Sequence, residues 1–300
     1  MYINNIVDVI GNTPLVRLNE CTGFEIYAKA EFLNPGGSIK DRVALNMIEA
    51  AERDGRLRKG MTIVEPTSGN TGIGLSLVGI RKGYPVVIVM PENMSEERKK
   101  IIHALGATLV LTPASLSIGG AVAEAERLVA SSDCYFMPQQ FKNPDNPAIH
   151  YMATGREIYE QMDGNVDVFV SGLGSGGTLQ GVGKYLKEKN PNLILVAVEP
   201  KNVSALLGDE PGLHSIQGIG DGFIPDVLNV SMIDEIVEVT DEDAIETTRM
   251  LARCQGLLCG TSSGANVWAA MQIAKKYGNR LRVATVLADR MERYFSTGLL

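Results

Sequence analysis

Residues 166–178 read Val-Asp-Val-Phe-Val-Ser-Gly-Leu-Gly-Ser-Gly-Gly-Thr, an apolar run that ends in a glycine-rich turn. The first six residues predict a buried strand, and the periodicity of residues 178–187 predicts a helix directly after the turn. Another apolar run, at 193–198, predicts a second strand. Strands that are apolar on both faces and alternate with helices indicate a parallel sheet between two layers of helices.

The same alternation runs through the rest of the chain. We therefore expect an α/β fold of two three-layer domains with mainly parallel sheets. Residues 142–148, which are rich in Asn and Pro, are a candidate junction. A smaller, mobile N-terminal domain would then span 36–145, and a larger one would comprise 1–35 and 146–300. The other predicted elements are strands at 62–65, 85–90, 108–111 and 282–287, and helices at 73–82, 96–105, 241–254 and 264–277.

Composition and charge exclude several classes of protein. The 300 residues are 45% hydrophobic and carry a formal net charge of −7, so no basic surface for nucleic acid is expected. No apolar run reaches the ~20 residues of a membrane-spanning helix. The N-terminus lacks the features of a signal peptide, which favours a cytoplasmic protein. The four cysteines show no CxxC spacing and the three histidines are dispersed, so we expect free thiols and no metal site.

A lysine stands at a predicted loop–helix junction in residues 34–42, Asn-Pro-Gly-Gly-Ser-Ile-Lys-Asp-Arg. Ser38 can cap a helix that begins near Lys40. The positive end of the helix dipole and partial burial would both lower the pKa of Lys40, and a neutral amine is what Schiff-base chemistry requires. The alternative is an ordinary exposed lysine at the start of a helix.

Two further turns, each between a predicted strand and a predicted helix, suit anions. Residues 66–72, Pro-Thr-Ser-Gly-Asn-Thr-Gly, offer hydroxyl and backbone N–H groups to a carboxylate, although an ordinary turn is equally compatible. The glycines of 172–178 let the backbone approach a phosphate, and Thr178 adds a hydroxyl.

Residues 172–177 also satisfy the G-x-G-x-x-G pattern of NAD-binding folds, and Glu199 ends the next strand, where a ribose-binding acid belongs. This interpretation gives no role to the lysine segment or to the turn at 66–72. The glycine turn also lies in the second half of the chain, whereas the NAD pattern usually opens the first strand–helix unit. An NAD-dependent oxidoreductase is therefore the lesser alternative.

Together, nine segments in order along the chain resemble the cysteine synthase (O-acetylserine sulfhydrylase) family of fold-type II pyridoxal-phosphate (PLP) enzymes. These enzymes have a tryptophan synthase β-like fold, and their relatives include the cystathionine β-synthases. Any one segment is a weak signal, but nine in order are specific for the family. The segments are residues 10–16 (Ile-Gly-Asn-Thr-Pro-Leu-Val), 34–42, 67–72, 90–92 (Met-Pro-Glu), 139–141 (Gln-Gln-Phe), 174–178, 216–220 (Ile-Gln-Gly-Ile-Gly), 262–265 (Ser-Ser-Gly-Ala) and 292–294 (Glu-Arg-Tyr).

The resemblance implies PLP as the cofactor and a role for each matching residue. Lys40 would hold PLP as a Schiff base and then remove the Cα proton of the substrate. Asn70 would hydrogen-bond the ring hydroxyl of the cofactor, and Ser262 would face its pyridine nitrogen. The phosphate would lie on Gly174, Ser175, Gly176, Gly177 and Thr178, and the substrate carboxylate among Thr67, Ser68, Gly69, Thr71, Gln140 and Gly220.

The implied reaction is β-replacement on a small amino acid: O-acetyl-L-serine and sulfide give L-cysteine and acetate through an aminoacrylate intermediate. A serine facing the pyridine nitrogen, in place of a carboxylate, favours β-elimination over transamination or racemisation. The family also implies a homodimer, closure of the smaller domain over the substrate and, as a further partner, the C-terminal peptide of serine acetyltransferase. A purely non-catalytic binding protein is disfavoured because Lys40 is intact.

Two positions depart from the family pattern. Where this chain has Asp221, cysteine synthases usually carry a small apolar residue and cystathionine β-synthases commonly a tyrosine. A carboxylate there could act as a general base on water or a thiol, and it would repel hydrosulfide. The alternatives are then a cysteine β-lyase or hydroxyl-lyase that releases hydrogen sulfide, or cystathionine formation; otherwise Asp221 only caps its loop. The second departure is Leu287-Ala288-Asp289-Arg290-Met291, where the family usually has proline and small polar residues before the Glu-Arg-Tyr segment.

Overall fold

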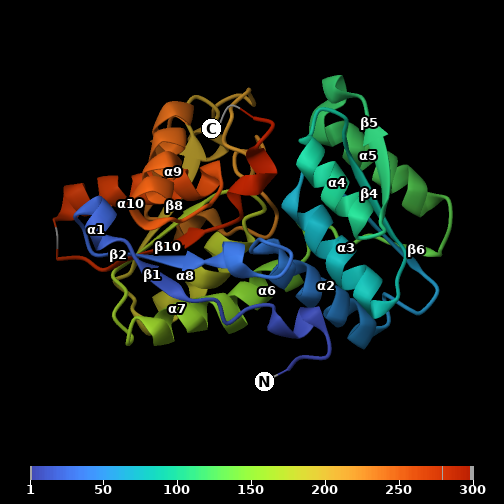
Figure 1. Ribbon diagram of the computed structural model, residues 1–300, viewed down its shortest axis with the longest axis horizontal. Coiled ribbons are helices and arrows are strands. Elements are labelled where there is room, and N and C mark those ends of the chain that lie inside the picture. Colours follow the sequence, from blue (N-terminus) through green and yellow to red (C-terminus); the bar gives the residue numbers. More distant parts are fainter. Residues whose placement is uncertain (1, 279, 298–300) are drawn as a thin grey trace.

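The computed structural model describes residues 2–278 and 280–297, which form two α/β units side by side (Figure 1). The larger unit contains a six-stranded sheet in the order β1-β2-β10-β7-β8-β9, and the smaller a four-stranded sheet in the order β5-β4-β3-β6. All paired strands are parallel except β1 and β2. The strands are β1 (Leu15–Arg17), β2 (Ile26–Ala30), β3 (Thr62–Pro66), β4 (Val86–Pro91), β5 (Thr108–Thr112), β6 (Tyr135–Phe136), β7 (Val168–Gly172), β8 (Ile194–Pro200), β9 (Glu235–Val239) and β10 (Val283–Leu287).

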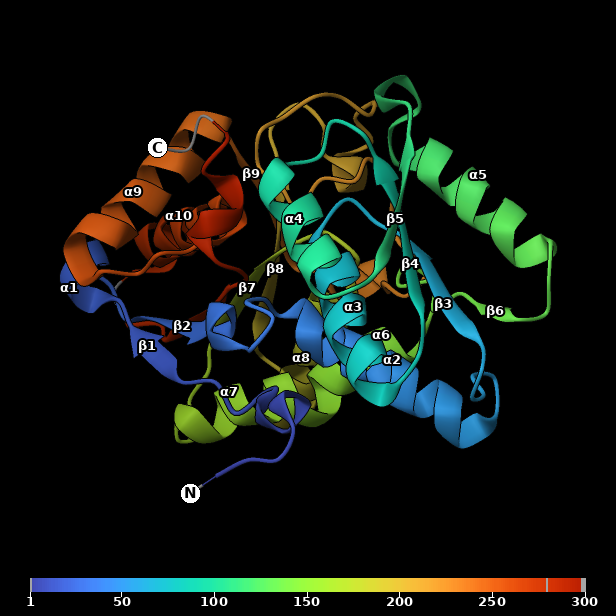
Figure 2. The ribbon, with the colours of Figure 1, turned by 45° about the vertical axis from the view of Figure 1, so that its right-hand side comes forward.

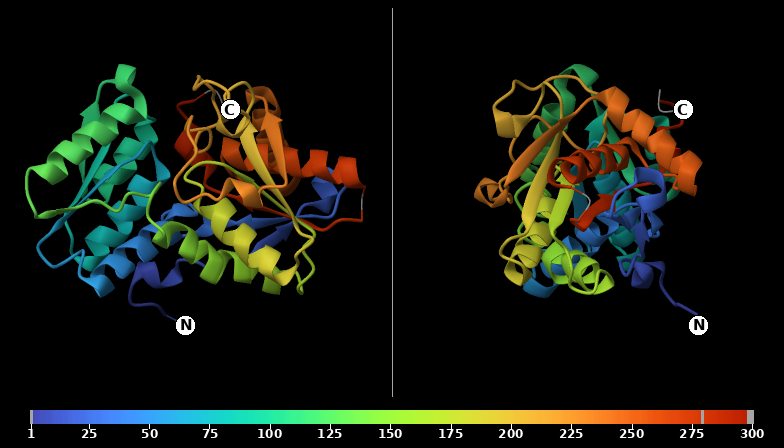
Figure 3. Two further views of the ribbon diagram at one scale, coloured as in Figure 1. Left: turned by 180° about the vertical axis from the view of Figure 1, so that it is seen from behind. Right: turned by 90° about the vertical axis from the view of Figure 1, so that its left-hand side faces the viewer.

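Helices cover both faces of each sheet (Figures 2 and 3). The α-helices are α1 (Asn19–Thr22), α2 (Lys40–Asp54), α3 (Asn70–Lys82), α4 (Glu96–Ala104), α5 (Ser117–Ala130), α6 (Asp145–Ile149), α7 (Arg156–Gln161), α8 (Gly177–Lys189), α9 (Asp241–Gln255) and α10 (Thr261–Tyr277). The shorter helical segments are η1 (Ile6–Val9), η2 (Glu31–Leu33), η3 (Ala114–Leu116), the π-helical η4 (His150–Gly155), η5 (Ala205–Leu207), η6 (Val230–Met232) and η7 (Met291–Tyr294). None of the described helices is both long and apolar enough to span a bilayer.

The strands are apolar on both faces because each face packs against helices. In β7, Val168 and Val170 pack in the cluster that contains α9 and α10, whereas Phe169 packs in the cluster that contains α7 and α8. In the smaller unit, Ile63 of β3 packs with α2 and α3, and its neighbour Val64 packs with α5 on the opposite face. This burial on two sides is the physical origin of the continuous apolar runs in the sequence.

The predicted α/β fold with mainly parallel sheets is confirmed, and each predicted strand and helix is present within three residues of its predicted bounds. The sequence patterns did not single out strands β1, β2, β6 and β9 or helices α1, α5, α6 and α7. In β2 the reason is physical: Lys29 interrupts the apolar pattern, and it is buried because its ammonium lies 2.8 Å from the carboxylate of Glu157.

Strand β10 lies at the centre of the larger sheet, between β2 and β7. Residues 283–287 pair with residues 26–30 on one side, and Val283 and Ala284 pair with β7 on the other. The N-terminal segment and the second half of the chain therefore share one sheet.

The cysteines only partly follow the prediction of free thiols. Cys21 in α1 and Cys254 in α9 form a disulfide, so the prediction is wrong for this pair. The two residues are 233 positions apart and meet only because α1 packs against α9, which spacing in the sequence cannot indicate. Cys134 is exposed and free, and Cys259 is buried and free. Burial raises the pKa of Cys259 to about 12, so it serves as a small core residue rather than a nucleophile.

Candidate active site

A cleft of about 480 Å³ lies between the two units, at the carboxyl ends of β3, β7 and β10. This edge of a parallel sheet is where α/β proteins bind ligands. A smaller pocket adjoins the cleft and is lined by the glycine turn after β7. The predicted residues that line the cleft are Lys40, Thr67, Ser68, Gly69, Asn70, Thr71, Gln140, Ser175, Gly220, Asp221 and Ser262. Those that line the adjoining pocket include Gly174, Gly176 and Thr178, whereas Gly177 lies next to them as the first residue of α8.

Lys40 is the first residue of α2 and projects toward the glycine turn. The helix begins at Lys40 as predicted, but its N-cap residue is Ile39 rather than Ser38, and Ser38 Oγ accepts the Lys40 backbone N–H at 3.2 Å. The Lys40 Nζ lies 3.3 Å from Ser175 Oγ. Burial lowers the pKa of the Lys40 ammonium, while the charges of Asp221 and Asp289 oppose that shift. The side chain therefore loses its proton more easily than an exposed lysine does.

The turn from Gly172 to Gly176 connects β7 to α8 and needs its glycines. A Cβ on Gly174 would lie 2.4 Å from the carbonyl oxygen of Gly218, and Gly176 has φ +79°. The backbone can therefore approach a ligand closely at this turn, and the positive end of α8 faces the same space. With the hydroxyls of Ser175 and Thr178 beside it, the turn has the properties of a phosphate site.

Two polar residues behind this turn were not found from the sequence. His150 in η4 is fully buried, with Nδ1 3.0 Å from Thr154 Oγ1 and Nε2 3.4 Å from Thr178 Oγ1. Burial and the charges of Lys40 and Arg42 lower the pKa of His150 well below its usual range, so the ring is neutral and orients the Thr178 hydroxyl. A lone histidine carries no spacing signal in the sequence.

Asn146, the second of these residues, holds the glycine turn through hydrogen bonds of its side-chain amide. Its Nδ2 donates to Gln140 O at 2.8 Å and to Ser175 Oγ at 3.1 Å, and it thereby connects the phosphate turn to the segment that carries Gln140. A Cβ on Gly177 would lie 1.9 Å from Asn146 Oδ1, so this glycine is required for packing against Asn146.

The second predicted turn, residues 67–71, joins β3 to α3. Thr67 and Thr71 are buried, and the Thr71 hydroxyl donates to Gln140 Oε1 at 2.6 Å. Gln140 is itself positioned by Glu65, whose carboxylate accepts backbone N–H groups from Gln139 and Gln140 at 2.8 and 2.9 Å. Burial raises the pKa of Glu65 to about 7. The turn presents hydroxyl and N–H donors at the start of a helix, which suits a carboxylate.

Asp221 also lines the cleft. It is half-buried between Gly220 (φ +73°) and Gly222 (φ +79°), and the carbonyl of Gly220 is 3.0 Å from His214 Nε2. Burial raises the pKa of Asp221, and the charges of Lys40 and His214 counteract this shift. Asp221 therefore lines the cleft close enough to Lys40 for their charges to interact.

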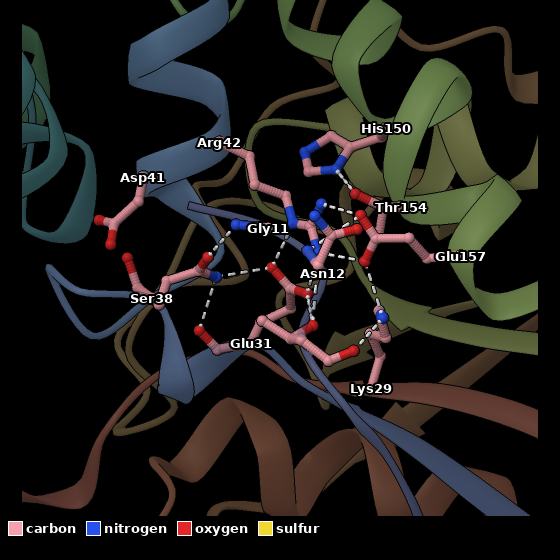
Figure 4. Close-up of polar contacts among 12 residues, drawn as sticks. Gly11, Asn12, Lys29, Glu31, Ser38, Asp41, Arg42, His150, Thr154 and Glu157 are labelled. Carbon is pink, nitrogen blue, oxygen red and sulfur yellow. Dashed lines mark hydrogen bonds and ion pairs between the residues drawn. The ribbon is translucent and has the colours of Figure 1, made fainter. Parts of the chain in front are cut away.

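A buried ion-pair network fastens the start of α2 to the larger unit (Figure 4). The Arg42 guanidinium contacts the carboxylates of Glu31 and Glu157 at 2.7 Å each, and Lys29 contacts Glu157 at 2.8 Å. Two cations and two carboxylates make the network neutral. Burial would raise the pKa of Glu157, but hydrogen bonds and charge from Arg42 and Lys29 lower it to about 2. Because Arg42 is two residues from Lys40, the network fixes where the amine lies.

The arrangement around Glu199 contradicts an NAD site. Its buried carboxylate accepts the Ser204 hydroxyl at 2.5 Å and the backbone N–H groups of Ala205 and Leu206 at 3.1 Å each. Glu199 therefore holds the turn that follows β8.

The fold and the cleft define a class of enzyme that holds a phosphorylated carbonyl cofactor beside a buried amine. The phosphate-type turn offers backbone N–H groups and hydroxyls to this space, and Lys40, Asn70 and Ser262 add an amine, an amide and a hydroxyl. Residues 6–289 match the family of pyridoxal-phosphate-dependent enzymes, and the chain belongs to this family. The predicted family, fold class and cofactor are thereby confirmed.

Several known proteins are similar to this chain over nearly its whole length. It is 50% identical to the cysteine synthase of Staphylococcus aureus strain Mu50, over 99% of this chain and 97% of the relative. It is 43% identical to O-acetylserine sulfhydrylase isoform 3 of Entamoeba histolytica, with a TM-score of 0.94 over 100% of this chain and 92% of that one. It is 42% identical to a hydrogen sulfide-producing enzyme of Fusobacterium nucleatum, with a TM-score of 0.94 over 98% of this chain and 100% of that one.

Gly174→Ala is expected to weaken PLP binding about 10- to 100-fold, because overpacking against the Gly218 backbone costs about 1–3 kcal/mol at the turn that receives the phosphate. The dissociation constant is measured by titrating the apoprotein with PLP and following visible absorbance. The matched control is Gly119→Ala in α5, where the new methyl group meets no atom within 4 Å. Equal affinities for the two variants would contradict the role of Gly174.

Proposed function

We propose that the chain catalyses cysteine synthase-type β-replacement, in which O-acetyl-L-serine and sulfide give L-cysteine and acetate. The observation that carries the proposal is the convergence of Lys40, the phosphate-type turn and the carboxylate-type turn on one cleft. The 50% identical relative named cysteine synthase supports it.

The turn at residues 67–71 would hold and orient the substrate. Its hydroxyls and N–H groups, with Gln140, would bind the α-carboxylate, so that Cα faces Lys40 and Cβ faces the Asp221 side of the cleft. Two fixed contact regions, one for the carboxylate and one around Lys40, restrict rotation and bring the reacting atoms together.

PLP, held by Lys40, Asn70, Ser262 and the turn at 174–178, would supply an electron sink for the electrons of the Cα–H bond. Lys40, with its lowered pKa, would accept the proton from Cα. Acetate then leaves Cβ, sulfide adds to Cβ, and Lys40 returns a proton to Cα. Ser262 would offer the pyridine nitrogen a hydroxyl rather than a carboxylate, which favours loss of the Cβ substituent over transamination or racemisation.

We propose further that residues 36–145 form a mobile domain whose closure excludes water. Contacts that bridge the units support this: Arg98 of α4 donates to Gln217 Oε1 and stacks on the Tyr294 ring at 5.0 Å, and Ser296 Oγ donates to Glu97 at 2.7 Å. Arg98 lines the cleft, and these contacts between the units would form and break with closure.

The direct test is an assay of the purified, PLP-saturated protein. Cysteine is expected to form when O-acetyl-L-serine and sulfide are both present, and to be absent when either is left out. A protein that binds PLP but forms no cysteine under these conditions would refute the proposed reaction.

A second candidate is a cysteine β-lyase that releases hydrogen sulfide, and Asp221 is the observation that favours it. A carboxylate in the cleft with a raised pKa can act as a base toward water or a thiol. The hydrogen sulfide-producing relative has a similar overall structure. Cystathionine formation, with a larger thiol as nucleophile, stays a further alternative.

Asp221→Asn distinguishes these candidates. We expect the rate with O-acetyl-L-serine and sulfide to change by no more than about threefold, because the carboxylate acts there only through its field. Sulfide release from L-cysteine is expected to fall about 100-fold, since that reaction loses its base. Both rates are measured by initial-velocity assays, with the exposed Asp226→Asn as control. A large loss of cysteine synthesis would make Asp221 essential to the main reaction.

We propose, from the family resemblance, that the protein is a cytoplasmic homodimer and that its cleft accepts the C-terminal peptide of serine acetyltransferase. Light scattering of the purified protein tests the dimer. Competition between that peptide and O-acetyl-L-serine tests the docking.

A further inference from the structure

We propose that Asp289 is a positioning residue that fixes the side-chain amide of Asn70 with an N–H toward the cofactor ring. The inference rests on the proposed role of Asn70 as a cofactor contact. It concerns one of the two positions at which the sequence departs from the family pattern, where small polar residues are usual.

The Asn70 amide is held from both ends by the segment that follows β10. Its Nδ2 donates to Asp289 Oδ2 at 2.6 Å, and its Oδ1 accepts from Arg293 Nη1 at 2.5 Å. An amide can be flipped by 180° with little change in shape, but here a flip would place Nδ2 against a guanidinium and Oδ1 against a carboxylate. Both charged partners therefore select one orientation.

Asp289 is itself held rigidly. It is fully buried, its Oδ2 also accepts the Tyr294 hydroxyl at 2.5 Å, and its backbone carbonyl accepts Gly260 N–H at 3.0 Å. Asp289 also forms an isolated β-bridge with Ser38, two residues before Lys40. The backbone of Asp289 is thus held at the start of α10 and at the segment before α2, and its carboxylate is held by Tyr294 of η7.

The orientation decides what Asn70 offers to the cleft. Asn70 lines the cleft, and Nδ2 carries two hydrogens, of which Asp289 takes one. The second N–H remains for an acceptor on the cleft side, such as a ring oxygen that bears negative charge. A carboxylate behind the amide polarises it and strengthens this second hydrogen bond.

The Asp289 carboxylate lies close enough to Arg293 of η7 and to Lys40 of α2 for their charges to interact. Its Oδ1 is buried with no hydrogen-bond partner among the described residues, and it abuts Gly260, where a Cβ would lie 2.2 Å away. A buried carboxylate that is only partly paired is a costly feature to keep for packing alone.

The test is a double-mutant cycle on PLP affinity. We expect Asp289→Ala and Asn70→Ala each to weaken PLP binding to the apoprotein about tenfold, and the double variant to be no weaker than the poorer single variant. Asp289→Asn keeps an acceptor oxygen and should recover most of the loss. Losses that simply multiply in the double variant would show that Asp289 does not act through Asn70, and would overturn the proposal.

A spectroscopic signature separates this role from a structural one. Asp289→Ala and Asn70→Ala should shift the visible absorption maximum of the bound cofactor in the same direction, since each removes the same hydrogen bond. The exposed Asp133→Ala is the control for lost charge and should leave the maximum unchanged. A wild-type spectrum in Asp289→Ala would also overturn the proposal. Neither measurement uses a substrate, so failure of the proposed reaction would appear separately, as PLP binding without cysteine formation.

Discussion

Replacement of Lys40 by alanine is expected to lower the rate of cysteine formation at least about 1,000-fold while leaving the fold intact. Lys40 is the one amine that the structure places between the phosphate-type turn and the carboxylate-type turn, among the residues lining the cleft and its adjoining pocket. Loss of a positioned acid–base group alone costs about 10²- to 10⁴-fold. Loss of the amine that holds the cofactor adds to this effect.

The fold should survive because the Lys40 side chain contributes little to it. The Lys40 side chain donates to Ser175 Oγ at 3.3 Å, and the contact of Lys40 with Ser38 is made by its backbone N–H, which alanine keeps. Initial rates with O-acetyl-L-serine and sulfide measure the effect, and thermal unfolding checks the fold. The matched control is Lys59→Ala, an exposed lysine outside the cleft. Activity within tenfold of wild type in Lys40→Ala would remove Lys40 from the mechanism.

Arg42→Met is expected to destabilise the protein by about 3–5 kcal/mol, the usual cost of removing one partner from a buried ion pair. Methionine has similar length and packs well, so the loss comes from charge. Glu31 and Glu157 would lose their guanidinium partner, and Lys29 alone would face two buried carboxylates. The free energy of unfolding is measured for the apoprotein by urea denaturation.

The control for Arg42 is Arg56→Met, which removes an arginine whose ion pairs with Asp54 and Asp145 are solvent-exposed. Exposed ion pairs contribute little to stability, so the urea midpoint of Arg56→Met should stay close to that of the wild-type protein. If the charge interpretation is right, adding Glu31→Gln to Arg42→Met should recover part of the lost stability, because it restores neutrality. No recovery would assign the effect to packing.

The parts of the site that could be predicted from the sequence are those formed by residues close together in the chain. The turns at 67–71 and 172–178 and the start of α2 at Lys40 depend on glycines, hydroxyls and capping within a few residues, and the structure contains all three. They also lie together, because the carboxyl ends of parallel strands share an edge.

The features that sequence did not predict all join distant segments. The disulfide between Cys21 and Cys254, the contact of His150 with Thr178 and the bond of Asp289 to Asn70 each require the tertiary structure. Lys29 shows this most clearly, because a charged residue within β2 hides the apolar pattern of a buried strand. The ion pair of Lys29 with Glu157, which only the tertiary structure forms, explains why the ammonium can be buried.

The central position of β10 determines when the larger unit can form during synthesis. The smaller sheet uses residues 62–136 alone, so it can form while later residues are still being added. Strands β2 and β7 are joined into one sheet only when residues 283–287 insert between them as β10. Until then both strands have an unpaired edge, the kind of surface that recruits chaperones or promotes aggregation. A nascent chain can therefore contain the complete phosphate-type turn and still lack a working cleft.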